Sequence, residues 1–503
     1  MAQFVLLLLL LVTIASPCCS EKHIYQDTMM VGSPPHSQRK YGKIQRTPAD
    51  RNGAEVIRYV GGAGIPDSYI VKLKTGLSRG KALDFTNTLK AEMTTTAFGN
   101  TRRGRGPQVG KLHEVGEIKF LTIETTDKGL AQLRRQTDVV DVIYQDTYVY
   151  ADGCTCLVDC QNKTEDLGDK QCWSYDTGVW GLDRIDQTTR LPNGKFNVKG
   201  TGSDVDVYIF DSGVYAEHQQ FLREDNSSRV TFGNKADTSW SDTDINGHGT
   251  HVAGTVGGIT TGVAKNVKLI NVKVLNDEGS GYTSGIMAML EWVRDQVDVT
   301  KRKSIINMSL GGPQQDLFDD LVNTLVTEAG IVVVVAAGND NSLASFTSPA
   351  NAEEAITVGA TWDNDDRAYF SNYGPRVDIW APGQFILSAY VGSPDSSAIS
   401  SGTSMACPMV AGAAAAYMST LDHNPSPTEV RQHLIATSMD NVVTNIPEKY
   451  CYKVTISREE GCYWWMGTCE REICLPGTSV TRLLNVGCDP SHSSYVDTQL
   501  ETL

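Results

Sequence analysis

The sequence predicts an α/β domain built on a mainly parallel central sheet with helices on both faces, hence three layers, preceded by a smaller α+β module. From about residue 175 to 437, apolar strand-like runs alternate with helical stretches. Such alternation is typical of a parallel sheet that is covered on both sides. Residues 67–150 carry a shorter series of strands and helices. With 503 residues, the chain is long enough for two or three domains.

The first 20 residues are predicted to be a cleaved secretory signal. An apolar run at 4–12 is too short to span a membrane and is followed by small residues through Ser20. No later stretch approaches about 18 consecutive apolar residues, so we expect a secreted protein without a membrane segment. Residues 21–66 show no hydrophobic periodicity and are predicted to be a flexible leader to which no fold is assigned.

Residues 67–150 are predicted to form the α+β module. Residues 68–73 alternate polar and apolar side chains like a strand. A helix, a strand, a helix and a last strand are then predicted at 78–92, 117–124, 127–136 and 138–145. This series is compatible with a ferredoxin-like fold. The basic segment at 101–106 is either a solvated loop, which we favour, or a processing site.

The larger domain is predicted from strands and helices that follow one another along the chain. Strands are expected at 205–210, 267–274, 304–310, 331–337 and 355–360. Helices are expected at 249–258, 283–297, 315–328 and 404–420. In an open parallel sheet of this kind, functional residues gather at the carboxyl ends of the strands.

Charge is divided unevenly along the chain. Residues 21–150 contain 20 Lys and Arg against 14 Asp and Glu, whereas residues 151–503 contain 24 against 45. The basic N-terminal part and the acidic remainder should attract each other at long range. The acidic part should repel nucleic acid and anionic membranes, so we expect neither as a partner. That the acidity serves only solubility is an equal alternative.

Ten cysteines follow the predicted signal, as two clusters around one isolated residue. They are Cys154, Cys156, Cys160, Cys172, Cys407, Cys451, Cys462, Cys469, Cys474 and Cys488. Neither cluster has the paired spacing with nearby histidines of a structural zinc site, so disulfides are favoured over zinc. Cys407 is expected to be a small buried residue; if it stays reduced, one of the other nine is free or unusual.

Three short blocks contain residue types suited to catalysis. Asp211 ends an apolar run, so its carboxylate is expected at the carboxyl edge of the sheet. His248 and His251 stand three residues apart at the start of a helix, and this spacing does not choose between them. Ser404 opens an alanine-rich helix, where free backbone N–H groups can hold a developing oxyanion. Taken one at a time, each block has an equally good alternative: Asp211 as a turn residue, the two histidines as a metal-binding pair, and Ser404 as an ordinary N-cap.

Together, the three blocks resemble the subtilisin-like serine proteases, or subtilases, whose catalytic residues follow in the order Asp, His, Ser. The similarity is greatest to the proteinase K-like group and covers nearly all of 178–447. It implies that residues 151–488 form a catalytic domain with the subtilisin-like fold. Residues 67–150 are similar to the inhibitory propeptide of that family.

The resemblance assigns a role to each residue of the three blocks. Ser404 would be the nucleophile, His248 the general base and then acid, and Asp211 the group that orients His248. His251 would be structural. The side chain of Asn339, with the backbone N–H of Ser404, would form the oxyanion hole.

The same resemblance implies where the substrate and a calcium ion bind. An extended peptide would pair with two glycine-rich segments, and small neutral residues would line the S1 pocket. These residues are Gly279, Ser280, Gly281, Ser309, Leu310, Gly311, Gly312, Ala336, Ala337 and Gly338. Such a pocket implies broad, apolar-leaning specificity. Oxygens of Glu353, Ala355 and Asp378 would hold a structural calcium, with a purely structural role for Asp378 as the alternative; no catalytic cofactor is implied.

Other segments depart from the simplest family members. Insertions at 153–172 and 448–478 carry cysteines, and the second contains Trp464 and Trp465. These tryptophans form either an exposed recognition patch or, as we favour, buried side chains of a surface insertion that disulfides hold together. Asn162 and Asn226 begin glycosylation sequons, whereas the sequon at Asn307 is discounted because it falls in a predicted buried strand. Residues 489–503 are predicted to be a polar tail.

The leading hypothesis is a secreted, monomeric serine endopeptidase that acts on proteins and peptides. The resemblance implies that it cuts its own propeptide near 145–153 and retains the propeptide as an intramolecular inhibitor. One alternative is a secreted binding scaffold that cleaves only its own propeptide, against which Asn339 argues. Another is a processing convertase, which would need an acidic pocket and usually a large following domain.

Overall fold

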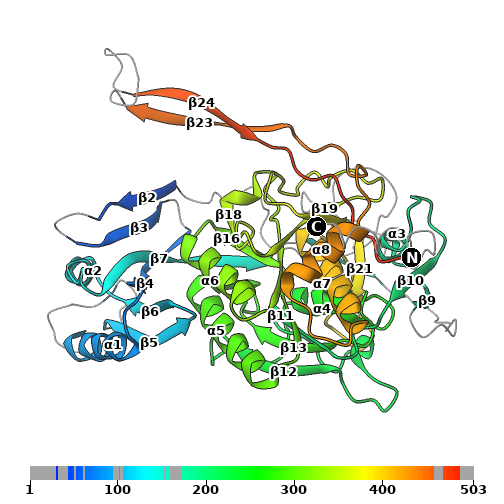
Figure 1. The fold of residues 1–503 in the computed structure, drawn as a ribbon, viewed down its shortest axis with the longest axis horizontal. Helices are drawn as coiled ribbons and strands as arrows, with labels where there is room; N and C mark the ends of the chain where they lie inside the picture. The colour runs from blue at the N-terminus through cyan, green and yellow to red at the C-terminus, as the bar shows by residue number, and fades with distance from the viewer. Residues whose placement is uncertain are drawn as a thin grey trace, which may run out of the picture.

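The computed structural model describes residues 30–31, 43–49, 53–60, 63–93, 101, 106–151, 154–158, 172–457 and 468–487. The predicted signal, the polar tail, Asn162, Trp464 and Trp465 lie outside these ranges. Two bodies stand next to each other in Figure 1, a small N-terminal module in blue and cyan and a larger α/β domain. Within the described ranges, no helix combines the length and the apolar character needed to cross a membrane.

A seven-stranded parallel sheet forms the centre of the larger domain. Its strands, in spatial order, are β12 (Val230–Lys235), β13 (Lys268–Lys273), β11 (Val205–Asp211), β15 (Lys303–Met308), β17 (Val332–Ala336), β19 (Ile356–Thr361) and β20 (Ile379–Pro382). Every neighbouring pair runs parallel. The chain crosses through an α-helix from β12 to β13, from β13 to β15 and from β15 to β17. The described connections from β17 to β19 and from β19 to β20 contain no α-helix.

Side chains that alternate along the strands divide the domain into two cores. On β11, Val207 and Ile209 join one core, whereas Tyr208 and Phe210 join the other. The first core packs against α4 (His248–Gly257), α7 (Thr403–Ser419) and α8 (Pro427–Thr437), the second against α5 (Thr283–Thr300) and α6 (Asp316–Thr327). The two groups of helices flank the sheet in Figure 1. The predicted three-layer α/β fold is therefore confirmed.

The N-terminal module contains one more strand than predicted. Its elements are β4 (Gly64–Leu73), α1 (Arg79–Met93), β5 (Gln108–Val115), β6 (Ile118–Glu124), α2 (Asp127–Arg134) and β7 (Val140–Ala151). The sheet order β7-β4-β6-β5, all antiparallel, is that of a ferredoxin-like fold. Strand β5 was missed because its pairing with β6 shifts register between Val109 and Leu112, which breaks the alternation of its side chains.

The prediction that residues 21–66 lack a fold was wrong for part of that segment. Strands β2 (Lys43–Thr47) and β3 (Glu55–Val60) form an antiparallel hairpin, and β3 pairs in parallel with β7. The described side chains of β2 are all exposed, so the strand has no apolar face that would signal it. Its pairing with β3, rather than an apolar face of its own, makes it a strand. A two-residue strand β1 (Met30–Val31) pairs with β8 (Cys154–Val158).

The sheet of the module is buried on both faces. Val71 and Leu121 point toward the module's own helices, whereas their neighbours Ile70 and Phe120 join the core beneath α5 and α6. Ion pairs cross the same interface, from Lys72 to Asp320 (3.3 Å), from Lys111 to Glu291 (3.4 Å) and from Arg46 to Asp316 (3.3 Å). These contacts agree with the predicted attraction between the basic and acidic parts of the chain.

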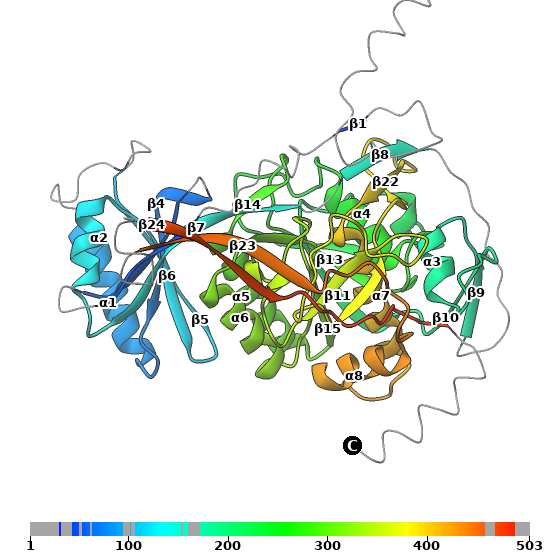
Figure 2. The same ribbon diagram turned by 90° about the horizontal axis from the view of Figure 1, so that it is seen from above.

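The two cysteine-bearing insertions differ in shape. At the ends of the first lie β8 and β9 (Cys172–Asp176), of which β9 pairs with β10 (Lys195–Lys199). The second forms a hairpin of β23 (Lys449–Ser457) and β24 (Thr468–Pro476), closed by a disulfide between Cys451 and Cys474. The hairpin projects from the domain toward the end of the molecule that carries the N-terminal module (Figures 1 and 2). Cys407 is reduced and buried.

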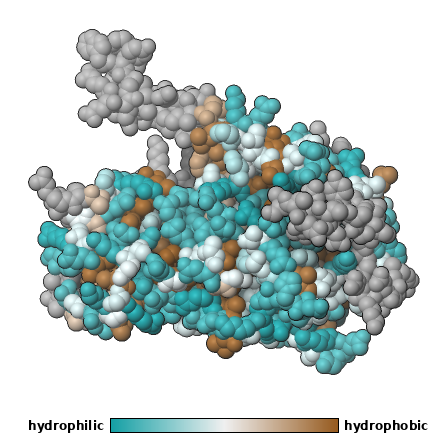
Figure 3. All heavy atoms as spheres, in the orientation of Figure 1, coloured by the Kyte–Doolittle hydropathy of each residue, from teal (hydrophilic) through white to brown (hydrophobic). Residues whose placement is uncertain are grey.

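The surface drawn in Figure 3 is mainly hydrophilic, with hydrophobic side chains scattered over it singly or in small groups. Scattered apolar residues are normal on a protein surface. The coloured part of this face therefore does not single out one large apolar docking area.

Candidate active site

Asp211 and His248 form a buried pair at the carboxyl edge of the central sheet. Asp211 is the last residue of β11 and His248 is the first residue of α4. The Nδ1 atom of His248 lies 2.8 Å from Oδ1 of Asp211, which also accepts a 2.7 Å bond from the backbone N–H of Ser212. The carboxylate is fully buried, so its hydrogen bonds fix both its own position and the orientation of the imidazole.

Two glycines beside His248 allow its close approach to Asp211. Gly247 precedes the helix with φ of +98°, and a Cβ at this position would overlap the ring of Tyr390. A Cβ at Gly249 would overlap the carbonyl oxygen of Gly213, in the loop that follows Asp211. The pattern Gly-His-Gly is therefore a packing requirement of this site.

His251 is placed away from the pair, one helical turn along α4. Its Nε2 atom lies 3.0 Å from the carbonyl oxygen of Ile386 and 3.2 Å from that of Ala398, so Nε2 must carry the proton. Burial, together with the charge of His248, lowers the pKa of His251 to about 3. A neutral histidine whose Nε2 is bound to carbonyl groups has a structural role. The structure thus separates the two histidines that spacing left equivalent.

Ser404 is the second residue of α7, which follows the N-cap Gly402 and begins at Thr403. Backbone N–H groups in the first turn of a helix have no partner within the helix and carry partial positive charge. The Oγ atom of Ser404 donates a 2.9 Å bond to the carbonyl oxygen of Ser309, and Oγ of Ser309 donates in turn to the carbonyl oxygen of Ser404 (2.9 Å). These two bonds attach the start of α7 to the chain that follows β15.

Asn339 follows β17 and reaches the same helix terminus. Its Oδ1 atom accepts bonds of 2.9 Å from both the N–H and the hydroxyl of Thr403, which fixes the orientation of the amide. The Nδ2 atom is buried, and the described residues offer it no hydrogen-bond partner. A buried donor without an acceptor is costly. Its presence next to Ser404 indicates a place where a substrate oxygen would be bound.

The chain's own strand β7 fills the groove between the two predicted substrate-binding segments. It pairs antiparallel with β14 (Ser280–Tyr282) on one side and β16 (Leu310–Pro313) on the other. Tyr150 lies opposite both Ser280 and Gly311, and the N–H of Ala151 donates to the carbonyl oxygen of Gly279 (2.9 Å). A Cβ at Gly312 would lie 2.9 Å from the side chain of Val149, so glycine leaves room for the inserted strand.

The next described strand after Ala151 is β8, which lies beside the strand that leads into Ser404. Strand β8 begins at Cys154 and pairs antiparallel with β22 (Ser397–Ser401), with Cys154 opposite Ser401. β22 leads directly into Gly402 and α7. The chain therefore pairs with β14 and β16 until Ala151, and with the strand that leads into Ser404 from Cys154.

The residues predicted for the S1 wall are buried but do not all face a pocket. Ala336 ends β17, and its side chain belongs to the core beneath α7. Ala337 packs in a separate cluster that includes Trp380. Gly338 has φ of +99°, and a Cβ there would overlap the amide of Asn372. The wall is therefore mainly backbone, with no carboxylate among these three residues.

Asp244 is a residue of the site that the sequence analysis missed. Its carboxylate accepts bonds from the N–H of Gly247 (2.9 Å), the hydroxyl of Ser212 (2.9 Å), and the N–H (2.9 Å) and hydroxyl (2.7 Å) of Thr250. Burial raises the pKa of Asp244. An acidic residue four positions before His248, within a polar turn, was the available signal for an anchor of α4.

The three residues predicted to hold calcium lie at the opposite edge of the sheet. Glu353 and Ala355 precede β19, and Asp378 precedes β20, so all three are at the amino ends of strands. Arg431 of α8 donates hydrogen bonds to the carbonyl oxygen of Glu353 and to the carboxylate of Asp378.

The two described sequons differ in exposure. Asn226 lies on an exposed turn with φ of +60°, whereas Asn307 is fully buried in β15. A glycan on Asn226 stays a prediction, and the burial of Asn307 agrees with its having been discounted.

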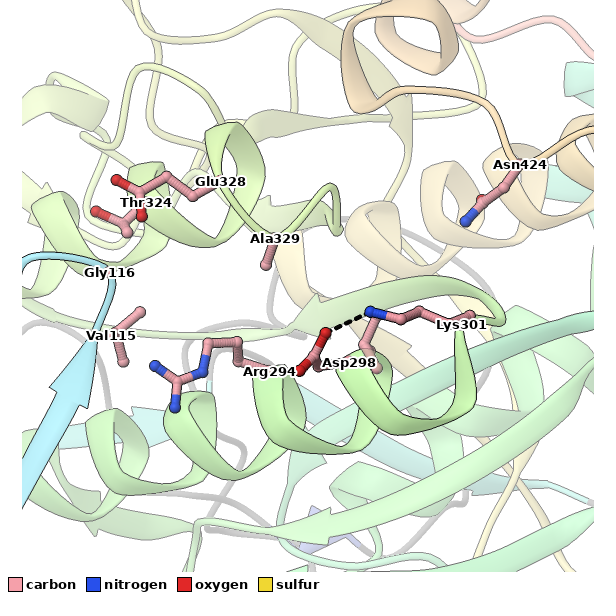
Figure 4. A pocket seen from close by; sticks show the side chains of 10 residues that line it. Val115, Gly116, Arg294, Asp298, Lys301, Thr324, Glu328, Ala329 and Asn424 are labelled. Carbon is pink, nitrogen blue, oxygen red and sulfur yellow. Dashed lines mark hydrogen bonds and ion pairs between the residues drawn. The ribbon is translucent and has the colours of Figure 1, made fainter.

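A hollow between the two bodies is separate from this site. It is lined by the turn at Gly116 and by the C-terminal ends of α5 and α6, with Arg294, the ion pair of Asp298 and Lys301, and Glu328 around it (Figure 4). The C-terminal end of α5 leads into the amino end of β15. The hollow is therefore at the edge of the sheet opposite Asp211.

Comparisons with known proteins show what this chain is similar to. A family model described as the subtilase family matches residues 202–452. An extracellular serine proteinase of Thermus sp. (strain Rt41A) is 40% identical over 341 residues, which cover 68% of this chain and 75% of that protein. A cuticle-degrading serine protease of Arthrobotrys oligospora is 36% identical over 408 residues, or 79% and 93% of the two chains. Among solved structures, a cold-adapted subtilisin-like serine proteinase is 39% identical and covers 54% of this chain and 94% of its own, with a TM-score of 0.49.

Proposed function

Because this chain belongs to the subtilase family of serine proteases, we propose that it is a secreted endopeptidase that hydrolyses proteins through an acyl-enzyme and removes its own propeptide. One observation carries the proposal. In a chain of this family, the buried pair of Asp211 and His248 is accompanied by Ser404 at a helix N-terminus and by an amide donor of Asn339 that has no partner among the described residues.

The proposed chemistry assigns one step to each group. His248 takes the proton of Ser404 as the hydroxyl attacks the scissile carbonyl carbon, and later gives that proton to the leaving amine. The Asp211 carboxylate holds the imidazole through Nδ1 and stabilises its cation. Nδ2 of Asn339 and the N–H of Ser404 donate to the oxygen that becomes negative in the tetrahedral intermediate. Water then hydrolyses the acyl-enzyme by the same steps.

The substrate is proposed to bind as β7 does, as an extended strand between β14 and β16. Main-chain hydrogen bonds to both strands supply affinity that does not depend on the substrate's sequence. Specificity then depends on the pockets, and the wall formed by Ala336, Ala337 and Gly338 presents mainly backbone and no carboxylate. We therefore expect broad cleavage with a preference for apolar side chains at P1.

Self-processing is supported by the course of the chain through the site. β7 reaches the groove as far as Ala151, and β8 starts beside β22 at Cys154. We expect the cut between these two residues, within the range implied by the family resemblance. The released segment up to Ala151 would stay in the groove and act as an inhibitor, held also by the packing of the module on α5 and α6.

The decisive experiment compares the wild type with Ser404→Ala. The wild type is expected to appear as two fragments, and after removal of the propeptide to digest casein and an apolar chromogenic peptide. The variant should remain one chain without activity, and N-terminal sequencing should place the mature start between 152 and 154. If the wild type processes itself but the freed domain shows no more activity than the variant, the endopeptidase proposal fails and a binding scaffold is indicated.

A preference at P1 can be read from a peptide-library profile of the mature enzyme. Phe and Leu are expected to exceed Lys and Arg there. A clear preference for Lys or Arg would contradict the proposed pocket.

A further inference from the structure

The amino ends of β19 and β20 are tied together by Asp378. The N–H of Asp378 donates to the carbonyl oxygen of Thr357 (2.9 Å), and Oδ2 of Asp378 accepts from the N–H of Thr357 (2.8 Å). This pair of bonds closes the start of the two parallel strands. Oδ1 of Asp378 takes no part in this pair of bonds. The loop at 353–355, which leads into β19, carries the other two oxygens that the family resemblance assigns to calcium.

Arg431 approaches this place from α8. Its neighbour Val430 is fully buried and Leu434, one turn on, nearly so; both belong to the core that α8 covers, which fixes the helix. The helix is also capped, because Oγ of Ser426 accepts from the N–H of Glu429 (3.1 Å). The stem of Arg431 therefore starts from a firmly held backbone.

The guanidinium of Arg431 bridges two of the three calcium-type oxygens. Its Nη1 atom donates to the carbonyl oxygen of Glu353 (3.0 Å), and Nη2 donates to Oδ1 of Asp378. Both side chains are partly buried, with 29% of Arg431 and 16% of Asp378 exposed. The planar fork thus supplies a positive charge and two correctly directed donors in one place.

These residues do not fit a calcium ion while Arg431 is present. Calcium takes six to eight oxygen ligands at roughly 2.3–2.6 Å. Here the carbonyl oxygen of Glu353 and the carboxylate of Asp378 face N–H groups of a cation, which would repel a second cation and leaves it no room between the same oxygens. The carboxylate also has its charge balanced already.

We propose that Arg431 is a built-in cation that takes the place of calcium between Glu353, Ala355 and Asp378, so that the stability of this edge of the sheet does not depend on the ion. The guanidinium joins α8 to the starts of β19 and β20, which in a calcium-dependent arrangement would be joined by the metal. The proposal rests on the family membership and on these contacts, not on proteolytic activity.

The test uses thermal unfolding of the full chain carrying Ser404→Ala, which avoids self-digestion, in EGTA and in calcium chloride. Arg431→Met keeps the length of the stem but removes the charge and both donors. Its melting temperature in EGTA is expected to fall by about 5 °C, since Asp378 loses its counter-ion in a partly buried place. Calcium is expected to recover part of this loss in Arg431→Met, because the oxygens are then free to bind it, and not in Arg431→Met with Asp378→Asn.

Arg376→Met is the matched control. Arg376 pairs with the side-chain carboxylate of Glu353 at 2.6 Å and donates to the side chain of Asn351 (3.3 Å), rather than to the carbonyl oxygen of Glu353 or to Asp378. This variant is expected to gain no response to calcium. Two results would overturn the proposal. One is a melting temperature that rises in calcium while Arg431 is still present, and no longer rises when Asp378→Asn is added. The other is an Arg431→Met protein whose melting temperature in EGTA is unchanged, or does not rise in calcium. If Arg431→Met does not fold, calcium is titrated calorimetrically into the parent and into the Asp378→Asn variant. A heat of binding that is seen in the parent and lost in Asp378→Asn contradicts the proposal. If the parent shows no such heat, the proposal is supported.

Discussion

Asp244 and Ser212 are joined by a hydrogen bond of 2.9 Å between the carboxylate of one and the hydroxyl of the other. Ser212 follows Asp211 directly, and its hydroxyl also accepts a 3.0 Å bond from the N–H of Gly249, which follows His248. Asp244 in turn holds the N–H groups of Gly247 and Thr250. Asp211 and His248 therefore come from separate elements whose ends are both held by the buried carboxylate of Asp244.

Asp244→Asn is expected to lower kcat by about tenfold to a hundredfold with little change in KM. An amide at this position presents an NH2 group where the carboxylate accepted hydrogen bonds, so α4 and the chain after Asp211 are no longer held together. A small displacement of His248 relative to Asp211 is expected to lower the rate of the chemical step. Steady-state kinetics on a chromogenic peptide measure the effect. Asp242→Asn is the control, since Asp242 is exposed on the same loop and pairs with Lys235. Equal loss in both variants would contradict a positioning role.

Asn339→Ala is expected to lower kcat by about a hundredfold to a thousandfold while KM stays near the wild-type value. The donor that is lost acts on the oxyanion, which exists in the transition state and not in the bound substrate. Kinetics of the mature enzyme check this. Asn424→Ala, at an exposed position away from the site, should leave both constants unchanged. A rise in KM alone would show that Asn339 binds the ground state.

Ala151→Pro is expected to slow processing of the precursor by at least about tenfold. Proline has no N–H, so the bond from Ala151 to the carbonyl oxygen of Gly279 is lost and the last residue of β7 no longer pairs correctly. Following the precursor by gel electrophoresis after synthesis measures the rate. Ala151→Ser retains the N–H and should be processed normally. If the proline variant matures at the rate of the serine variant, β7 is not bound as a substrate during the cut.

His251 should make the folded protein sensitive to acid. Its pKa is about 3 when folded, because it is buried, against about 6.5 when unfolded. Between these values the unfolded chain binds a proton that the folded chain does not. The free energy of unfolding therefore falls as pH falls below about 6.5, by roughly 1 kcal/mol per pH unit for this residue, and is unaffected above that pH.

Urea unfolding of the Ser404→Ala chain at pH 7 and pH 5 measures this dependence. His251→Gln should be less stable at pH 7 but lose roughly 2 kcal/mol less between the two values. His423→Gln removes an exposed histidine and should keep the slope of the parent. A slope that is the same in all three chains would show that His251 does not contribute.

Much of the fold follows from local patterns in the sequence. Residues 205–210 were recognisable as a strand because they form a short apolar run, and 404–420 as a helix because a long, alanine-rich apolar stretch begins at Ser404. Strand β2 and strand β5 were not recognisable. The described side chains of β2 are exposed, and a register shift interrupts the pattern of β5, so their pairing partners rather than their own residues determine them.

The sequence by itself determined the order Asp211, His248, Ser404 and the alternation of strands and helices, since both can be read along the chain without knowing which segments meet. The tertiary structure showed that His248 rather than His251 lies beside Asp211, a choice that spacing left open and that the family resemblance implied. Only the tertiary structure revealed Asp244 and brought Arg431 to Glu353 and Asp378, which are 78 and 53 residues away. The physical reason is common to all three. A buried polar group must find a partner for each hydrogen bond, and the partner is chosen by the folded backbone across distances that no local pattern records.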